Sequence, residues 1–355
     1  KGLGPRYCPS IEDKIVRFSE KERHQLFIEP EGKETIEIYL NGFSTSLPED
    51  IQIKALRKIK GLEKVKLFRA GYAIEYDYFP PTQLKKTLET KLIKNLFFCG
   101  QINGTTGYEE AACQGLIAGI NANQKVKGKE KFILTRSDAY IGVLIDDLIT
   151  KGTEEPYRMF TSRAEYRLLL RQDNADIRLT KKGFELGLAN KKRLEKLEIK
   201  NQQTDILIKF LQKQNIEIKL INSVLEKKKS KIVNQKKKLF SFLSRPHITF
   251  KDICVSVELR NFIKENKISE EAIEQAEIII KYGGYLNKEA ESAKKLSKLE
   301  EIRIPENFDY SKLHSISTEG KEKLNSIQPT SIGQAGRISG VSPSDINVLL
   351  IYMGR

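Results

Sequence analysis

The sequence predicts an α/β region followed by an all-α region. Up to about residue 125, short apolar runs alternate with turn signals and amphipathic segments. From about residue 140 onward the apolar residues recur at helical spacing. The chain has 355 residues, of which 39% are hydrophobic and 31% charged, so it is long and apolar enough to bury a sizeable core.

In the first region, apolar runs predict short strands at residues 36–40, 65–68, 72–76 and 96–99. Residues 47–60 predict a helix, because acidic residues open it, apolar residues share one face and Gly61 follows it. A glycine-rich turn at 100–107 leads into a second predicted helix at 108–123, which carries a face of small residues.

In the second region, the pattern predicts helices at residues 138–150, 162–170, 269–281, 288–299, 318–325, 331–338 and 343–352. Ser162 and Glu165 have the spacing of a capping box. Ser342, Pro343 and Asp345 form a favourable helix start, with Ser342 as the cap and proline in the first turn.

The net charge of +15 is concentrated in the second region. Residues 1–150 hold 23 Lys/Arg against 20 Asp/Glu, whereas residues 151–355 hold 39 against 27. This asymmetry indicates a polyanionic partner, nucleic acid before a membrane surface. The alternative is a Lys-rich, solvated surface, which is the default interpretation of the triple-lysine runs at 227–229 and 236–238.

Several protein classes are excluded by composition. The longest apolar run, residues 348–353, is far too short for a membrane span. The cysteines lie far apart without a CxxC pair, so we predict neither a disulfide scaffold nor a metal site. No signal or transit peptide opens the chain, and because it does not begin with Met we expect a fragment whose front is missing.

The turn at residues 100–107 is a candidate nucleotide cradle. Its glycines allow backbone N–H groups to approach a ligand, and the following helix N-terminus favours negative charge. It does not have the G-x-G-x-x-G spacing, and the chain contains no Walker A motif. The alternative is ordinary strand–turn–helix packing.

Cys8 is a candidate reactive cysteine. Pro5 and Pro9 restrict the backbone around it, and Arg6 can favour its thiolate. The alternative is a partly buried, inert thiol. Cys99 and Cys113 are predicted to lie in the core.

The arginines of residues 155–171 are a candidate RNA-binding group. On the predicted helix, Arg163, Arg167 and Arg171 would share one face and repel one another, a cost that a phosphate backbone would remove. Two nearby aromatic residues, Tyr157 and Tyr166, can stack on bases. The alternative is intrachain pairing with Glu165 and Asp173.

The last two predicted helices have a helix-turn-helix outline, which is a weak signal by itself. Arg337 is the only basic residue in the stretch 331–352, a poor provision for contacting DNA. We therefore predict no DNA partner.

Taken together, five motifs in order resemble one family, and they lie at residues 4–14, 71–77, 100–112, 157–171 and 331–341. They are similar to the large flavoprotein subunit of the bacterial tRNA uridine 5-carboxymethylaminomethyl modification enzymes, the MnmG or glucose-inhibited division protein A family. The resemblance covers essentially the whole chain and is looser between about 195 and 325. One departure is at the front, where the family's G-x-G-x-x-G fingerprint is absent.

The resemblance implies an FAD-dependent enzyme that acts with a GTPase, MnmE. Such a pair adds a carboxymethylaminomethyl or aminomethyl group to C5 of the wobble uridine of certain tRNAs. In that family, methylenetetrahydrofolate supplies the one-carbon unit and glycine or ammonium supplies the amine. NADH reduces the flavin. It further implies a cytoplasmic homodimer within a heterotetramer with MnmE, and no membrane partner.

Site residues follow from the same resemblance. Cys8 would be catalytic. The NAD-associated stretch would comprise Gly4, Pro5, Arg6, Tyr7, Cys8, Pro9, Ser10, Ile11, Glu12, Asp13, Lys14, Ile15, Val16, Arg17 and Phe18. Gln101 would contact FAD, and we add Asn103, Gly104 and Thr105 of the same turn. From the arginine pattern itself, and not from the resemblance, we predict that Arg158, Arg163, Arg167 and Arg171 bind RNA.

On this mapping the chain is the end of a Rossmann-type FAD/NAD(P)-binding flavoprotein with a C-terminal helical domain. Residues 1–78 would be the end of an inserted NAD-type domain, and residues 79–140 would be the closing part of the FAD-binding domain. Residues 141–280 would form a helical tRNA-binding region, and residues 281–355 a helical module that binds the partner protein. Without its N-terminal segment the fragment is expected to be inactive. Two alternatives are a shorter folate/FAD-dependent tRNA uridine methyltransferase, which lacks the long helical tail, and a non-catalytic RNA-binding helical protein.

Overall fold

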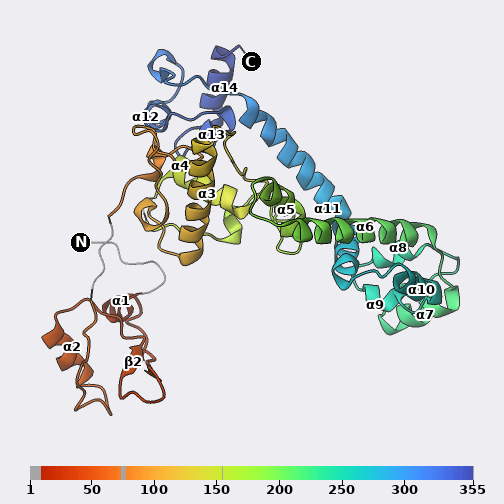
Figure 1. The fold of residues 1–355 in the computed structure, drawn as a ribbon, viewed down its shortest axis with the longest axis horizontal. Helices are drawn as coiled ribbons and strands as arrows, with labels where there is room; N and C mark the ends of the chain where they lie inside the picture. The colour runs from red at the N-terminus through yellow and green to blue at the C-terminus, as the bar shows by residue number, and fades with distance from the viewer. Residues whose placement is uncertain (1–8, 73–76, 154, 355) are drawn as a thin grey trace. The chain divides into compact units, whose positions relative to one another are not determined.

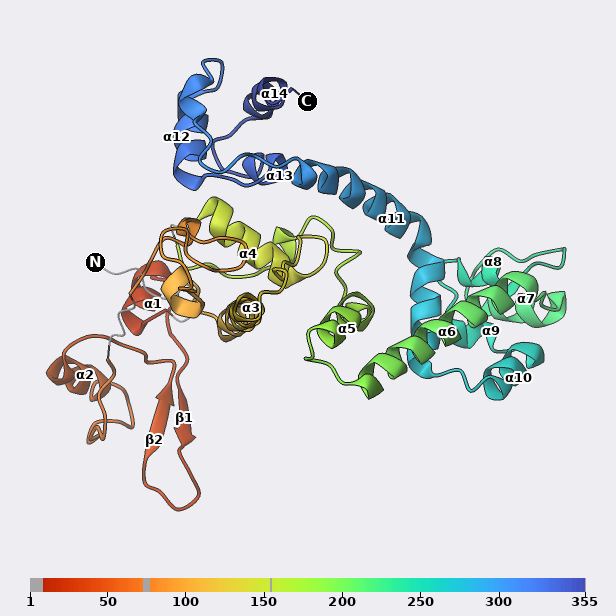
Figure 2. The same cartoon turned by 45° about the horizontal axis from the view of Figure 1, so that its top comes forward.

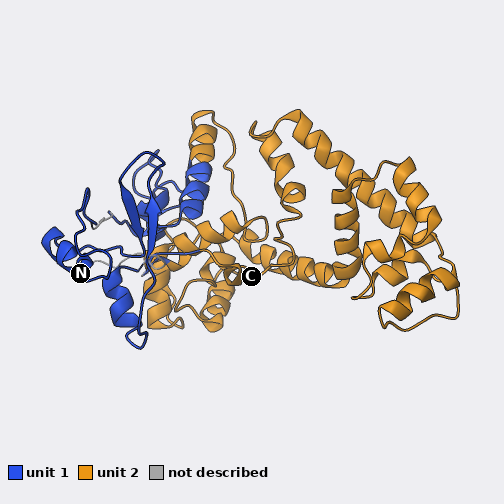
Figure 3. Cartoon of the chain, turned by 90° about the horizontal axis from the view of Figure 1, so that it is seen from below, with its two compact units in different colours: residues 1–118, 152–158 blue, residues 119–151, 159–355 orange. Residues whose placement is uncertain are grey.

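The computed structural model describes residues 9–72, 77–153 and 155–354. The chain forms two compact units, one of residues 1–118 and 152–158 and one of residues 119–151 and 159–355 (Figure 3). The first holds the small sheet and the second is helical, so the α/β to all-α layout is confirmed. The predicted strand at 72–76 lies almost wholly outside the described residues.

The first unit is built from short elements and includes a projecting β-hairpin (Figure 2). Strands β1 (Phe27–Pro30) and β2 (Ile38–Asn41) pair antiparallel, with Phe27 opposite Asn41. The remaining elements are α1 (Ile11–Arg17), α2 (Glu49–Leu56), the 3-10 turns η1 (Pro81–Gln83) and η2 (Gly100–Asn103), and the first part of α3 (Tyr108–Val126).

The predicted strand at 36–40 and the helices at 47–60 and 108–123 are confirmed with shifted ends. The strands predicted at 65–68 and 96–99 are wrong. Phe97 makes only an isolated bridge with Glu89, and the 65–68 run pairs with no strand among the residues that the structure describes. An apolar run becomes a strand only where a neighbouring chain offers backbone partners.

The second unit starts within α3 and continues into α4 (Tyr140–Lys151), which is buried from Gly142 to Thr150. Gly152, with φ of +70°, follows its end. The chain then passes through the 3-10 turn η3 (Thr161–Arg163) to α5 (Ala175–Glu185).

The helix predicted at 162–170 does not form. After η3 the backbone is extended at Ala164, which is buried, and residues 167–169 form a turn. The guanidinium of Arg136 binds both the Arg163 carbonyl and the Glu165 carboxylate, at 3.1 and 2.8 Å. These tertiary contacts override the local helical pattern, so Arg163, Arg167 and Arg171 do not share a helix face.

A helical lobe follows, shown in green to blue-green in Figure 1. It consists of α6 (Lys191–Lys213), α7 (Ile218–Lys227), α8 (Leu239–Leu243), α9 (Phe250–Ile253), α10 (Val257–Glu265) and the first part of α11 (Glu270–Glu301). Its core runs from Leu207 to Ile280 and includes the fully buried Phe242.

Helix α11 is continuous, although two helices were predicted there. Gly283 and Gly284 lie inside it without breaking it. The helix packs on α6 and α8 and, further along, on α13 (Ile332–Ala335) of a C-terminal module. That module also contains η4 (Tyr310–Lys312), α12 (Thr318–Ile327) and α14 (Pro343–Tyr352), with its own apolar core.

The predicted cap of the last helix is confirmed and does more than cap. Ser342 and Asp345 form a capping box, and Asp345 also accepts hydrogen bonds from the backbone N–H and the hydroxyl of Ser317, at 2.8 and 3.0 Å. One carboxylate therefore joins the starts of α12 and α14. Of the helices in the described ranges, none has the length and apolar content needed to cross a bilayer.

We expect Asp345→Asn to lower the free energy of unfolding by about 2 kcal/mol at pH 7, because hydrogen bonds to a charged acceptor are lost. Burial opposes the charged form of Asp345, but the bonds from Ser317 and Ser342 lower its pKa below the usual value. This contribution is present above the unfolded pKa of about 4 and is lost as the pH falls below it. Denaturant melts at pH 7 and pH 3 measure the difference. The exposed Glu322→Gln is the control, and an equal deficit for Asp345→Asn at both pH values would contradict the assignment.

Candidate functional site

The glycine-rich turn at residues 100–107 is organised by one buried glutamine. Gln114 of α3 accepts hydrogen bonds from the Gly100 N–H at 3.0 Å and the Asn103 amide at 2.8 Å. Its own amide donates to the Thr105 hydroxyl at 2.7 Å. The side chains of Gln114, Asn103 and Thr105 are all fully buried, so this network sets the shape of the turn.

The predicted FAD-contacting residues divide into two groups. Gln101 is exposed, whereas Asn103 and Thr105 point into the network of Gln114 and can serve a ligand only by shaping the backbone. One observation fits a negatively charged ligand: the first turn of α3 offers backbone N–H groups. Asn103 Oδ1 has no hydrogen-bond partner in the described chain, but the side chain is fully buried within the network.

Gly104 is required by its surroundings. Its φ is +77°, and a Cβ at this position would lie 2.6 Å from the Thr153 hydroxyl oxygen. Its carbonyl accepts a hydrogen bond from the Tyr157 N–H at 2.8 Å. The turn is thereby attached to the segment that precedes the predicted arginine group.

Arg158 contributes to the same site. Its guanidinium lies 3.1 Å from the buried carboxylate of Glu110 and 3.7 Å from Glu109. Both acids belong to the first turn of α3. Arg158 therefore offsets the negative charge that would otherwise repel an anion from this helix N-terminus.

The other arginines are arranged differently. Arg171 pairs with Asp173 at 2.9 Å, which matches the alternative interpretation, and Arg163 lies 4.0 Å from Asp147. Arg167 is exposed and has no carboxylate within ion-pair distance among the described residues. Tyr157 and Tyr166 are 5% and 7% exposed, so the expectation that they stack on bases is wrong.

Arg136 is a buried charge that the sequence analysis missed. It contacts Asp146 at 3.2 Å, Asp147 at 2.7 Å and Glu165 at 2.8 Å. Burial disfavours its charge, but these three carboxylates raise its pKa. The available signal was the acidic pair Asp146–Asp147 inside an otherwise apolar helix, since buried carboxylates need a cation.

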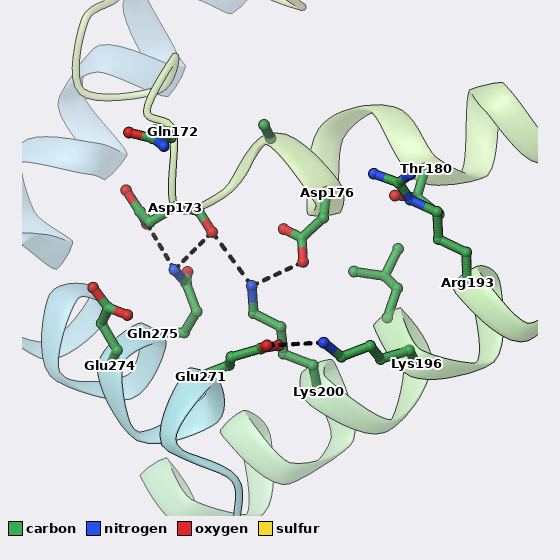
Figure 4. Close-up of a pocket in the computed structure, with 12 residues that line it drawn as sticks. Gln172, Asp173, Asp176, Thr180, Arg193, Lys196, Lys200, Glu271, Glu274 and Gln275 are labelled. Atoms are coloured by element: carbon green, nitrogen blue, oxygen red, sulfur yellow. Dashed lines mark hydrogen bonds and ion pairs between the residues drawn. The ribbon is translucent and has the colours of Figure 1, made fainter. Parts of the chain in front are cut away.

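A polar cleft of about 830 Å³ lies between α5, α6 and α11 (Figure 4). Lys196 pairs with Glu271 and Lys200 with Asp176, at 2.8 and 2.9 Å. Gln275 donates to Asp173 at 2.7 Å. The cations and acids alternate around the cleft and pair with one another. The cleft therefore has no excess positive charge for an anionic ligand, and its ion pairs serve to join the three helices.

The predicted NAD-associated stretch is described only in part. Gly4, Pro5, Arg6, Tyr7 and the predicted catalytic Cys8 lie outside the described residues. Ser10 caps α1, and Lys14 donates to the Gly42 carbonyl at 2.8 Å. Ile15 and Val16 are 56% and 77% exposed, so α1 presents apolar surface.

The Gln114 network yields a prediction about the stability of the site. Gln114→Leu leaves the buried Gly100 N–H without its partner, whereas Asn103 and Thr105 keep their bonds to the Phe98 and Gly100 carbonyls. We therefore expect the free energy of unfolding to fall by about 1–3 kcal/mol, the cost of one unsatisfied buried group. Urea denaturation of the chain measures this. Gln101→Leu, at an exposed position of the same turn, is the control and should change the stability by less than about 0.5 kcal/mol. Similar stability of both variants would show that Gln114 does not organise the turn.

Comparison with known proteins gives one consistent result. Residues 1–130 match the family described as "Glucose inhibited division protein A". Residues 191–290 match the "tRNA modifying enzyme MnmG/GidA C-terminal helical domain", and residues 292–355 match the corresponding C-terminal helical bundle.

Individual relatives agree with these family matches. The chain is 62% identical to the tRNA uridine 5-carboxymethylaminomethyl modification enzyme MnmG of Christiangramia forsetii, over 100% of this chain and 57% of that protein. It is 59% identical to the MnmG of Karelsulcia muelleri, over 99% of this chain and 56% of that protein.

Among solved structures, Aquifex aeolicus GidA in its form II crystal matches with a TM-score of 0.77 and 45% identity, covering 100% of this chain and 56% of that one. The chain thus spans a little over half the length of these relatives. Since the matches run through the whole chain and name the same proteins, the chain belongs to the MnmG/GidA family of tRNA-modifying enzymes.

Proposed function

We propose that this chain is part of an FAD-dependent enzyme that modifies the wobble uridine of certain tRNAs at C5. The observation that carries the proposal is identity of about 60% along the entire chain to proteins named for this modification. The product would carry a carboxymethylaminomethyl or aminomethyl group. The reaction would use methylenetetrahydrofolate as carbon donor and glycine or ammonium as amine donor.

FAD would bind at the turn of residues 100–107. The exposed Gln101 and the N-terminal N–H groups of α3 would hold it, and the Gln114 network would keep the turn in shape. When bound, the flavin supplies the redox chemistry of the reaction, with NADH as reductant. The stretch Gly4 to Phe18 would contribute to the nicotinamide site.

The GTPase MnmE would be the protein partner, in a cytoplasmic heterotetramer with a homodimer of the complete protein. The surface of the C-terminal module favours a protein partner. Ile351 and Tyr352 of α14 are 75% and 54% exposed, and residues 331–352 carry little charge. Arg158, Arg163, Arg167 and Arg171 remain candidates for tRNA contacts. Among them Arg167 is best placed, because it is exposed.

Two other functions are separable by experiment. A folate/FAD-dependent tRNA uridine methyltransferase would leave a methyl group at C5, and a non-catalytic RNA-binding protein would leave uridine unchanged. Nucleoside analysis of tRNA after incubation with the full-length enzyme, MnmE and the substrates distinguishes all three. The visible absorbance of the purified full-length enzyme tests independently whether it binds a flavin.

We predict that Cys8→Ser in the full-length enzyme abolishes the modification, because a serine hydroxyl is a far weaker nucleophile than a thiolate at neutral pH. Melting temperature and tRNA affinity should be unchanged. The control is Cys99→Ser, which should retain activity. Its thiol is free and exposed, so the prediction that Cys99 lies in the core is wrong. Normal amounts of modified uridine from Cys8→Ser would make this cysteine structural.

A second prediction separates the arginines. Arg167→Ala should weaken binding to every tRNA and flatten the slope of log K against log salt by about 0.7–0.9, since one phosphate contact is lost. Arg171→Ala removes the ion-pair partner of Asp173, so it should lower the melting temperature and leave the salt slope nearly unchanged. Filter binding at several salt concentrations gives both slopes. An unchanged affinity and slope for Arg167→Ala would exclude it from the RNA contact.

A further inference from the structure

The segment from the last residue of α7 to the start of α8 is the most basic stretch of the described chain. Residues 227–238 contain seven lysines and no acid, and we call this segment the lysine loop. All seven lysines are exposed: Lys227, Lys228, Lys229, Lys231, Lys236, Lys237 and Lys238. Like charges at this density repel one another, so the arrangement costs free energy unless a polyanion is bound.

The lysine loop is held in a defined shape. Val233 is only 7% exposed, and its backbone N–H and carbonyl both bind the Asn222 side chain, at 3.0 and 2.9 Å. Arg245 donates to the Lys231 carbonyl at 2.6 Å and lies over the ring of the buried Phe242. Further along, Lys237 accepts a backbone bond from Ile216. The lysines therefore stand on a scaffold anchored to the core of the lobe.

Few of these charges are neutralised within the protein. Lys228 pairs with Asp252 at 3.1 Å, and the Lys238 ammonium donates to the Lys213 carbonyl. Within the described ranges, the other five have no carboxylate within ion-pair distance. Arg158 and Arg171, by contrast, are paired with acids of their own chain. The lysine loop is thus a dense group of positive charges that the described chain leaves largely unpaired.

We propose that the lysine loop is a docking surface for the phosphate backbone of the substrate RNA. This proposal rests on the tRNA-modifying function proposed above and names a surface that serves it. Lysine ammonium groups bind phosphates as point charges without reading bases, so the loop would contribute affinity and orientation rather than sequence selection.

RNA fits the loop better than a lipid surface does. Ile232, 48% exposed, is its only exposed apolar side chain, and Val233 is turned into the core. A membrane-binding segment adds a broad apolar face to its lysines, which this loop lacks. Its rigid mounting also suits a partner of fixed geometry, such as a folded RNA, because little conformational entropy is lost on binding.

The test uses this chain with four substitutions, Lys227→Gln, Lys229→Gln, Lys236→Gln and Lys237→Gln. Four lost phosphate contacts should flatten the slope of log K against log salt by about 3, at about 0.7–0.9 per contact. We expect at least a roughly tenfold loss of tRNA affinity at 0.1 M salt. The matched control changes the charge equally at exposed lysines of α11, namely Lys288, Lys294, Lys295 and Lys298. It should alter the affinity by less than about twofold if contact rather than net charge matters.

The outcomes are distinguishable. Equal losses in the two variants would overturn this proposal and leave the tRNA-modifying function standing. If the unchanged chain binds tRNA no more tightly than it binds heparin of equal charge, both this proposal and the proposed tRNA-modifying function are contradicted. Binding to phosphatidylserine vesicles that is lost in the loop variant, with tRNA binding unchanged, would assign the loop to a lipid surface and overturn the proposal. As a second measurement, bound tRNA should protect Lys229 and Lys236 from acetylation, and leave Lys294 reactive.

Discussion

The buried guanidinium of Arg136 is the interaction on which much of the second unit depends. It neutralises Asp146 and Asp147 of α4, binds the Glu165 carboxylate and holds the Arg163 carbonyl. Asp146 also accepts hydrogen bonds from Arg337 of the C-terminal module, at 2.7 and 2.9 Å. A buried pair of this kind is costly to break, by about 3–5 kcal/mol, because the remaining charge is stranded. The same network therefore joins α4, the 160–170 segment and the end of the chain.

The basic side chains of this protein fall into two groups, those paired with acids and those left unpaired. Where an arginine lies near an acid, as Arg158 does near Glu110 and Arg171 near Asp173, the pair stabilises local structure. Where lysines gather without acids, as in the lysine loop, folding leaves their charge exposed. The first arrangement supports the site at the glycine-rich turn. The second provides long-range attraction for a polyanion.

The glycine-rich turn follows the same logic with neutral groups. A single amide, that of Gln114, bonds Gly100, Asn103 and Thr105, while Gln101 stays exposed. Because the network is buried, the turn is shaped before any ligand binds, which reduces the entropy lost on binding. Arg158 then adjusts the electrostatics of the adjoining helix N-terminus.

The sequence by itself identified the family through the resemblance of its motifs. It also determined the α/β to all-α order, the helices α3, α4 and α14, and the Ser342–Asp345 cap. These structural features depend on local periodicity and on side chains that bond their own helix, so neighbouring residues suffice. Only the tertiary structure decided that the 162–170 segment is not helical, that Tyr157 and Tyr166 are buried, and that Gln114 and Arg136 organise their surroundings. The physical reason is that a buried charge or amide bonds to groups that lie near it in space, whatever their distance in the sequence. Arg136, for example, bonds to Glu165, which is 29 positions away in the chain.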